Sequence, residues 1–235
     1  SKALYGGPRC YEHITNNQVL LAGPSGYLNG LITGSKLLAP YHFVKDISSD
    51  SQDPSRMIAR FGTYNLGNIL NLQVVKFTMI DLIGLDLPVE FQPRRTLKCF
   101  RVPVIGEKAV LVLSRYSKEG WKSCVSAETE ITPYGENEEL LWRHRITTEV
   151  GDCGATMVAL SDQKIVGFHS LGGISMNYFV PVTQELLDFL SSKTEKPLVP
   201  WRFSEDQVDV GGLYIHNDFD KFPFVKTIQK LVGFQ

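Results

Sequence analysis

The chain has 235 residues, 43% of them hydrophobic and 21% charged, with a formal net charge of −1. This length and apolar content suit one large β domain or two small barrels that bury a core of their own. The near-neutral net charge argues against nucleic-acid binding that depends on the overall charge of the protein. No apolar run approaches the ~20 residues of a membrane-spanning helix. The spacing of the four cysteines matches neither a zinc site nor a dense disulfide framework, so free thiols in a reducing compartment are expected.

Short apolar or alternating runs separated by turn residues predict strands along most of the chain. The predicted strands cover residues 18–22, 37–39, 72–77, 108–113, 156–159, 164–169 and 177–182. Turns are expected at 23–26, 46–54, 133–137 and 161–163, where Gly, Pro, Asn, Asp and Ser gather. A helix is predicted over 183–191, because its leucines lie at helical spacing, and a short terminal helix around 227–231. The pattern is all-β and shows no alternation of strands with helices.

Two structural units and a tail are predicted along the chain. Residues 1–115 are assigned to a first β-barrel, 116–196 to a connection and a second β-barrel, and 197–235 to a C-terminal extension rich in aromatic and acidic residues. The stretch 128–145, polar and turn-rich in its first half, is interpreted as the connection between the barrels.

The most distinctive local feature is Gly151-Asp152-Cys153-Gly154, directly before a predicted strand. Glycines on both sides of the cysteine let the backbone turn sharply and bring N–H groups toward the sulfur. In acyl transfer such N–H groups form an oxyanion hole, for which Gly151 and Cys153 are the candidates. Since such a tetrapeptide also arises by chance, partners elsewhere in the chain must support it.

A cysteine nucleophile needs a base, because the thiolate attacks and a free thiol has a pKa of about 8.5. His42 follows the apolar run 37–39 at a predicted strand end, where a barrel presents side chains to a cleft. Asp81 opens an apolar strand and would orient the imidazole, with Asp86 as its nearest rival. The order His, Asp, Cys is that of chymotrypsin-like enzymes and the reverse of the papain-like order.

Two further residues predict a specificity pocket in the second barrel. Thr148 lies before the cysteine and His169 after it, at positions that line the pocket for the residue preceding the scissile bond (P1) in a chymotrypsin-like barrel. A hydroxyl and a neutral imidazole can donate to a side-chain amide oxygen, which would select glutamine. The other histidines are interpreted as structural: His13, His144 (buried and paired) and His216. The other cysteines are interpreted as inert: Cys10, Cys99 and Cys124.

Motifs along the whole chain resemble the protease of the potyvirus nuclear inclusion protein a, a relative of the picornaviral chymotrypsin-like cysteine proteases. They occur in the family's order and at its spacings. The motifs are Ser1-Lys2-Ala3-Leu4-Tyr5-x-Gly7-Pro8, Asp81-Leu82-Ile83-x-Leu85-x-Leu87-Pro88, Trp142-x-His144-x-Ile146-x-Thr148, Gly151-x-Cys153-Gly154, Ile165-Val166-Gly167-x-His169-Ser170, Asn177-Tyr178-Phe179 and Trp201-Arg202-Phe203.

The resemblance implies an all-β fold of two antiparallel, six-stranded-type, chymotrypsin-like β-barrels, with the triad His42, Asp81 and Cys153 between them. It implies cleavage of a viral polyprotein after Gln and before Ser, Gly or Ala, without cofactor or metal. Thr148 and His169 would hold the P1 glutamine. The substrate would pair as an added strand with Ser170, Leu171 and Gly172. Gln235 would be the protein's own P1 residue, and Ser1 the residue after the upstream cut.

Three departures from the family pattern, and two alternatives, accompany this resemblance. Pro40 lies where the family has a Thr-Asn-x-His segment, Val150 replaces an Asp, and the loop 171–176 differs. The resemblance also suggests RNA binding on the same fold as a second activity, and a place in the host cytoplasm and nucleus. A protease relative that serves only as a scaffold is the third interpretation, against which the intact His42, Asp81, Gly151 and Gly154 speak.

Overall fold

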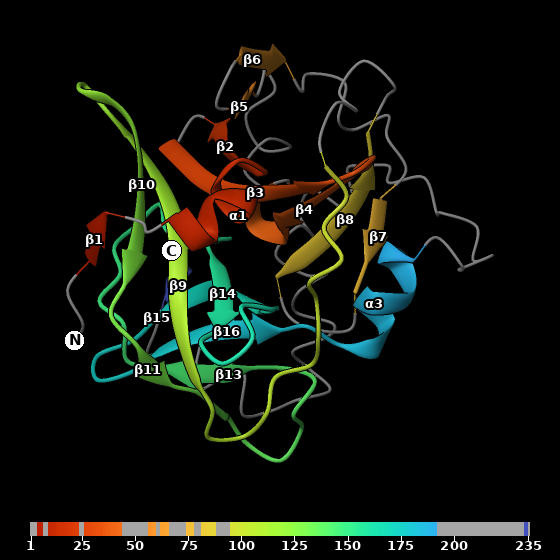
Figure 1. Ribbon diagram of the computed structural model, residues 1–235, viewed down its shortest axis with the longest axis vertical. Coiled ribbons are helices and arrows are strands. Elements are labelled where there is room, and N and C mark those ends of the chain that lie inside the picture. The colour runs from red at the N-terminus through yellow and green to blue at the C-terminus, as the bar shows by residue number, and fades with distance from the viewer. Residues whose placement is uncertain are drawn as a thin grey trace, which may run out of the picture.

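The computed structural model describes residues 4–6, 9–23, 26–43, 56–59, 62–65, 74–77, 81–87, 95–191 and 233–234. In this part of the chain, strands form two antiparallel sheets that lie against each other (Figure 1). The terminal helix predicted around 227–231, the turn predicted at 46–54 and nearly all of the C-terminal extension lie outside the described residues.

The first sheet has seven strands in the order β6-β5-β2-β3-β4-β8-β7, and each neighbouring pair is antiparallel. All but Leu28 of the leucine and isoleucine residues in β2, β3, β4 and β8 are buried at 0–2% exposure, because the apolar runs of the sequence face a common core. The strands are β2 (Gln18–Gly23), β3 (Gly26–Thr33), β4 (Lys36–Pro40), β5 (Arg56–Ala59), β6 (Gly62–Asn65), β7 (Val74–Lys76) and β8 (Leu82–Asp86).

The second sheet has ten strands, with the main order β1-β10-β9-β14-β15-β16-β13-β12. Two short strands join it from the side, β11 against β9 and β17 against β15. The strands are β1 (Leu4–Gly6), β9 (Lys108–Ser117), β10 (Gly120–Ser126), β11 (Thr129–Glu130), β12 (Thr132–Pro133), β13 (Trp142–His144), β14 (Thr156–Ala159), β15 (Ile165–Gly172), β16 (Asn177–Pro181) and β17 (Gly233–Phe234).

The predicted boundary between the barrels at residue 115 is wrong. Residue 115 lies inside β9, which pairs along both edges, with β10 and with β14. The stretch 128–145, predicted as the connection, instead contributes β11, β12 and β13 to the second sheet. These strands are only two or three residues long, so turn residues dominate the local pattern. The described part of the connection is the irregular stretch 95–107, where Arg101 N–H donates to Ile165 O at 3.0 Å.

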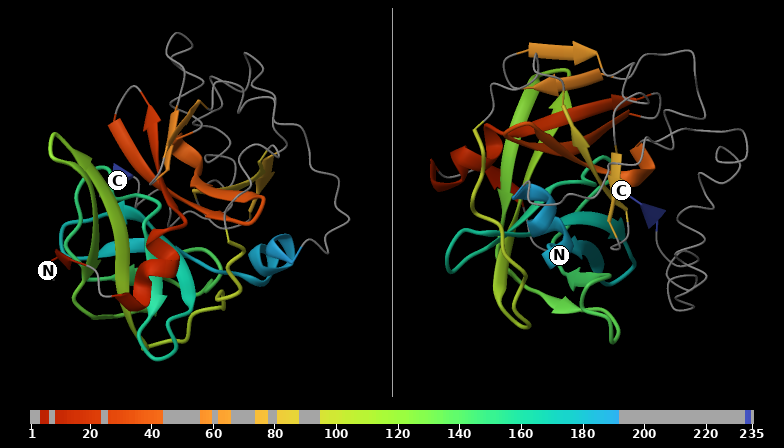
Figure 2. Two further views of the ribbon diagram at one scale, coloured as in Figure 1. Left: turned by 45° about the horizontal axis from the view of Figure 1, so that its top comes forward. Right: turned by 90° about the vertical axis from the view of Figure 1, so that its right-hand side faces the viewer.

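Buried polar groups join the two sheets. Both views in Figure 2 show the long hairpin of β9 and β10 extending from the second sheet past strands of the first. At this junction Gln18 Nε2 donates to Val112 O at 2.8 Å, and Ser114 N–H donates to Asn29 Oδ1 at 2.9 Å. Gln18, Asn29 and Ser114 are each fully buried, so their hydrogen bonds fix how the sheets sit against each other.

The predicted helix over 183–191 is confirmed as α3 (Gln184–Leu190), whose N-cap Thr183 accepts a hydrogen bond from Leu186 N–H. Its Phe189 packs edge-on against Phe77 of the first sheet, at 5.3 Å between ring centroids, and Figure 1 shows α3 beside β7. Because α3 follows the last long strand of the second sheet, this contact holds the two sheets together. The other helical segments of the described residues are η1 (Arg9–Tyr11), α1 (Glu12–Thr15) and a turn at 41–43. None of the helices in the described part of the chain combines the length and hydropathy that a bilayer crossing needs.

Candidate active site

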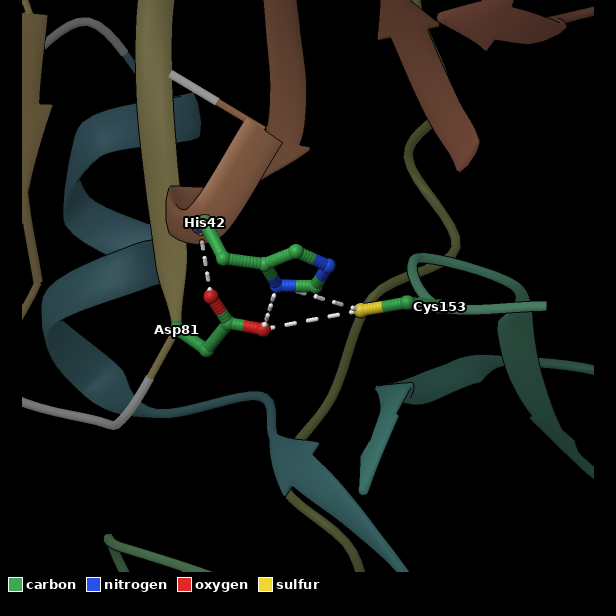
Figure 3. Close-up of side chains that lie close together, drawn as sticks. All are labelled: His42, Asp81 and Cys153. Atoms are coloured by element: carbon green, nitrogen blue, oxygen red, sulfur yellow. Dashed lines mark hydrogen bonds and ion pairs between the residues drawn. The ribbon is translucent and has the colours of Figure 1, made fainter. Parts of the chain in front are cut away.

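Strand pairing in the first sheet brings His42 and Asp81 together. His42 lies in a helical turn at 41–43 that follows β4, and Asp81 directly precedes β8. These strands are antiparallel and pair Pro40 with Leu82, so the end of one meets the start of the other. The His42 N–H donates to Asp81 Oδ1 at 2.8 Å, and His42 Nδ1 lies 2.7 Å from Asp81 Oδ2 (Figure 3).

The backbone of Asp81 has an uncommon conformation, and its buried carboxylate is held in place beside His42. Its φ is +59°, which is uncommon for a residue other than glycine and is a form of strain that gathers at functional sites. Its carboxylate is fully buried and also accepts from Ser170 Oγ of β15 at 3.0 Å. The rival Asp86 lies at the other end of β8 and pairs with Lys36 Nζ at 3.0 Å. The structure therefore places Asp81, and not Asp86, beside the histidine.

Cys153 reaches the same point from the second sheet. Its Sγ lies 3.8 Å from His42 Nδ1, and it donates to Asp81 Oδ2 at 3.5 Å (Figure 3). Burial raises the pKa of the Cys153 thiol well above its ordinary value, and the charge and hydrogen bonding of Asp81 add to the rise. The sulfur is therefore a protonated thiol in this arrangement. A base must remove its proton during attack, because no thiolate stands ready.

The backbone around the nucleophile, residues 149–154, forms a tight turn that we call the nucleophile loop. Gly151 has φ +104° and Gly154 has φ +86°, values that side chains other than glycine rarely tolerate. A Cβ on Gly154 would also collide with the backbone oxygen of Asn29 in β3. Asn29 further holds the loop, because its N–H donates to Cys153 O at 2.8 Å and its Nδ2 donates to Gly151 O at 3.2 Å. The two glycines thus permit the sharp turn of the backbone that the sequence predicts around Cys153.

A pair of buried histidines lies next to this loop. His144 Nε2 and His169 Nδ1 are 2.9 Å apart, and both rings are 1% exposed, which confirms His144 as buried and paired. The N–H of Ile146 donates to His144 Nδ1 at 3.1 Å. Burial lowers the pKa of His144 well below its ordinary value, and the neighbouring His169 adds to this, so His144 is neutral.

This hydrogen-bond chain fixes the position of each ring proton. Since His144 Nδ1 accepts from a backbone N–H, its proton is on Nε2 and is donated to His169 Nδ1. The proton of His169 is then on Nε2. His169 is consequently a neutral donor at the far side of its ring, which is the form that an amide oxygen requires.

Thr148 is positioned from the facing strand. Asn177 of β16 donates from Nδ2 to Thr148 Oγ1 at 2.9 Å and to Ile146 O at 2.7 Å. Val150 lies where the resembling family has an Asp, and it is 81% exposed. The side chain that holds Thr148 is therefore that of Asn177. Sequence reasoning noticed Asn177 only as part of a motif, and nothing in the local pattern pointed to its contact with Thr148.

The end of β15 pairs with a short extended segment. Leu171 and Gly172 pair antiparallel with Phe234 and Gly233 of β17. Ser170, the preceding residue of β15, donates to the Asp81 carboxylate. The strand that carries His169 thus touches the triad at one residue and offers backbone hydrogen bonds at the next two.

The donor atoms of His42, Asp81 and Cys153 lie within 4.8 Å of one another. An imidazole, a carboxylate and a thiolate would suit zinc. The same set where two antiparallel β-sheets meet, with the nucleophile in a turn between two glycines of positive φ, defines a cysteine peptidase of chymotrypsin-like fold.

Comparison with known proteins supports this class. The chain belongs to peptidase family C4, whose pattern matches residues 1–229. The protease of tobacco vein mottling virus is 25% identical, with a TM-score of 0.70 over 88% of this chain and 95% of that one. A catalytically inactive tobacco etch virus protease complexed with substrate has a TM-score of 0.72 at 24% identity, over 84% of this chain and 92% of that one, and shows the same fold.

Two genome polyproteins illustrate the sequence relatives. That of brome streak virus (strain German) is 99% identical over 108 residues, 46% of this chain and 12% of the polyprotein. That of sweet potato mild mottle virus (isolate Salazar) is 28% identical over 225 residues, 93% of this chain and 6% of the polyprotein. The chain therefore spans only a small part of the polyproteins it matches.

Proposed function

We propose that this chain is a viral polyprotein-processing cysteine endopeptidase that cleaves after glutamine, before Ser, Gly or Ala. The observation that carries the proposal is the pairing of Leu171 and Gly172 with an extended segment, on the strand that reaches the triad. An endopeptidase must bind its substrate as an extended chain, and strand addition supplies backbone hydrogen bonds whatever the side chains. Ser170, Leu171 and Gly172 are the predicted substrate strand.

The preference for glutamine rests on His169 and Thr148. The chain of hydrogen bonds from Ile146 through His144 makes His169 a neutral donor, and the contact of Asn177 with Thr148 orients a hydroxyl nearby. Two neutral donors favour the amide oxygen of glutamine. A glutamate at P1 would bring a negative charge, which the two neutral donors His169 and Thr148 cannot balance.

The reaction follows from the placement of the triad. His42 takes the thiol proton of Cys153, the sulfur attacks the carbonyl carbon, and the N–H groups of Gly151 and Cys153 hold the resulting oxyanion. The imidazolium gives its proton to the leaving amine, and water then hydrolyses the thioester. Asp81 accepts a hydrogen bond from the Nδ1 proton of His42 throughout the reaction.

The resting geometry requires one small movement before attack. The ring nitrogen nearest to the sulfur is Nδ1, which also faces Asp81 (Figure 3). For proton transfer, the His42 side chain must turn so that Nε2 reaches Cys153 while Nδ1 keeps its proton and donates it in a hydrogen bond to Asp81. Such contacts commonly tighten only when substrate is bound.

The test is cleavage of a peptide that carries residues 230–235 followed by Ser-Lys-Ala. The protein and its Cys153→Ala variant are compared on this peptide and on versions with Glu or Asn at P1. Cleavage after Gln by the first and none by the second establishes both the nucleophile and the P1 preference. If neither variant cuts this peptide or any member of a Gln-containing library, the proposal is wrong.

RNA binding and a place in the host cytoplasm and nucleus stay predictions of the family resemblance. RNA affinity that falls with salt and survives Cys153→Ala would establish a second activity independent of peptide cleavage.

A further inference from the structure

A buried ion pair lies directly behind the nucleophile. The Asp152 side chain is 1% exposed, and its partner Arg115 of β9 is 32% exposed. Arg115 Nε donates to Asp152 Oδ1 at 3.0 Å, and Nη2 donates to Oδ2 at 2.7 Å. The N–H of Glu149 donates to the same Oδ2 at 2.9 Å. Both carboxylate oxygens are thus held, which fixes the direction of the side chain next to Cys153.

The backbone of Asp152 is fixed at the same time. Its N–H donates to Glu149 O at 3.2 Å, and its carbonyl accepts from Ala155 N–H at 3.0 Å. In a trans peptide unit the C=O and the following N–H point in opposite directions. Anchoring the carbonyl of Asp152 to Ala155 therefore turns the N–H of Cys153 to the opposite side, where it can serve the oxyanion.

Two neighbouring residues of β9 support the nucleophile loop. Arg115 holds Asp152, while Ser114 N–H donates to Asn29 Oδ1, and Asn29 in turn holds the carbonyls of Gly151 and Cys153. The loop is thus supported by side chains from both sheets. Its two strongly positive φ angles are open to glycine and to few other residues.

We infer that Arg115 is a positioning residue for catalysis, which acts through Asp152 to hold the nucleophile loop with the Gly151 and Cys153 N–H groups turned toward the substrate carbonyl. This inference rests on the proposed function and deepens it. A buried ion pair stabilises a fold no better than apolar packing does, so a stability role alone gives little reason for one here. What the planar guanidinium does supply is a two-point geometry that a lysine cannot reproduce.

The test compares Arg115→Met, Asp152→Asn and the double variant with a matched control, Arg101→Met. Arg101 makes an equally extensive network, with Nη1 and Nη2 on Glu107 at 2.8 and 2.6 Å and Nε on Asp162 at 2.7 Å. That network lies at the turn that follows β14, whereas Cys153 precedes this strand. The control therefore removes a similar ion pair without touching the nucleophile loop.

Three measurements separate positioning from folding. The first is kcat and KM on the Gln peptide, the second is the alkylation rate of Cys153 by iodoacetamide, and the third is inhibition by a peptide aldehyde ending at P1 Gln. Alkylation uses the thiol but no oxyanion hole, whereas the hemithioacetal formed by the aldehyde places its oxygen there.

For Arg115→Met we expect kcat to fall about 10- to 100-fold, less than the 10²- to 10³-fold loss from removing a whole oxyanion donor, because the N–H groups are misdirected and not removed. KM and alkylation should change little, and aldehyde affinity should fall with kcat. The double variant should recover part of the loss, because it leaves no buried carboxylate without its cation. Arg101→Met should lower Tm but leave kcat unchanged.

Several results would overturn the inference. They are an unchanged kcat in folded Arg115→Met, an equal loss of kcat in Arg101→Met, or alkylation falling in step with kcat. If Arg115→Met does not fold, the isosteric Asp152→Asn decides, and an unchanged kcat in that variant refutes the inference. A wild-type protein that cuts no Gln peptide refutes the proposed function instead.

Discussion

Replacing His144 with leucine is expected to weaken the recognition of P1 glutamine. His144 Nε2 donates to His169 Nδ1 at 2.9 Å, and both rings are 1% exposed. Leucine fills part of the space but donates nothing, so this buried acceptor loses its donor. The proton of His169 is then no longer fixed on Nε2, and the hydrogen bond that it makes to the P1 amide oxygen is worth about 0.5–1.5 kcal/mol. Since 1.4 kcal/mol is a factor of ten in rate, kcat/KM on the Gln peptide should fall about 2- to 12-fold.

The selectivity should change as well as the rate. Without the proton from His144, His169 can place its own proton on either nitrogen. The ratio of kcat/KM for P1 Gln to that for P1 Glu should therefore decrease. The assay measures both peptides across pH for the wild type and for His144→Leu.

A matched variant separates this effect from a loss of folded protein. In His144→Gln the side-chain amide offers a donor to His169 and an acceptor to Ile146 N–H, so it should restore much of the selectivity. Iodoacetamide titration of Cys153 counts the competent sites in each variant. A Gln-to-Glu ratio that stays at the wild-type value in His144→Leu refutes the hydrogen-bond chain as the source of selectivity.

Three further perturbations test other parts of the site. Asp81→Asn removes a charge that adds to the effect of burial on Cys153, so the pKa of the thiol should fall and the pH at which alkylation sets in should shift to a lower value. At the same time kcat should fall about 10²- to 10⁴-fold. Gly154→Ala should lower Tm more than Gly120→Ala does, because both have strongly positive φ but only the first Cβ collides with backbone; equal Tm losses would contradict the collision. Deleting residues 233–235, which include β17, should lower the KM of added peptide by freeing the edge of β15; an unchanged KM would show that this edge does not compete with substrate.

The acid of the triad illustrates how far local patterns reach. Asp81 and Asp86 flank the same short apolar run and are chemically alike. Local sequence favours Asp81 only by its position before the strand. The pairing of β4 with β8 decides between the two acids, because it puts Asp81 beside the turn that carries His42 and Asp86 beside Lys36.

The boundary between the sheets shows where local patterns fail. The predicted boundary at residue 115 falls inside β9 (Lys108–Ser117), because nothing in the residues of this strand says which sheet it joins. Its partners β10 and β14 come later in the chain, so its place is decided by pairings that form only in the folded protein. The polar stretch 128–145 was misassigned for the same reason, since very short strands gain their identity from their partners.

By itself, the sequence determined the strand-rich class, the helix α3, and the glycine turn around Cys153. These features depend on periodicity and on backbone freedom, which neighbouring residues decide. Tertiary structure alone decided the contacts of Arg115 with Asp152, of His144 with His169 and of Ser170 with Asp81. Each joins residues on different strands or loops, and a hydrogen bond of about 3 Å between them depends on strand register, which a single sequence does not display.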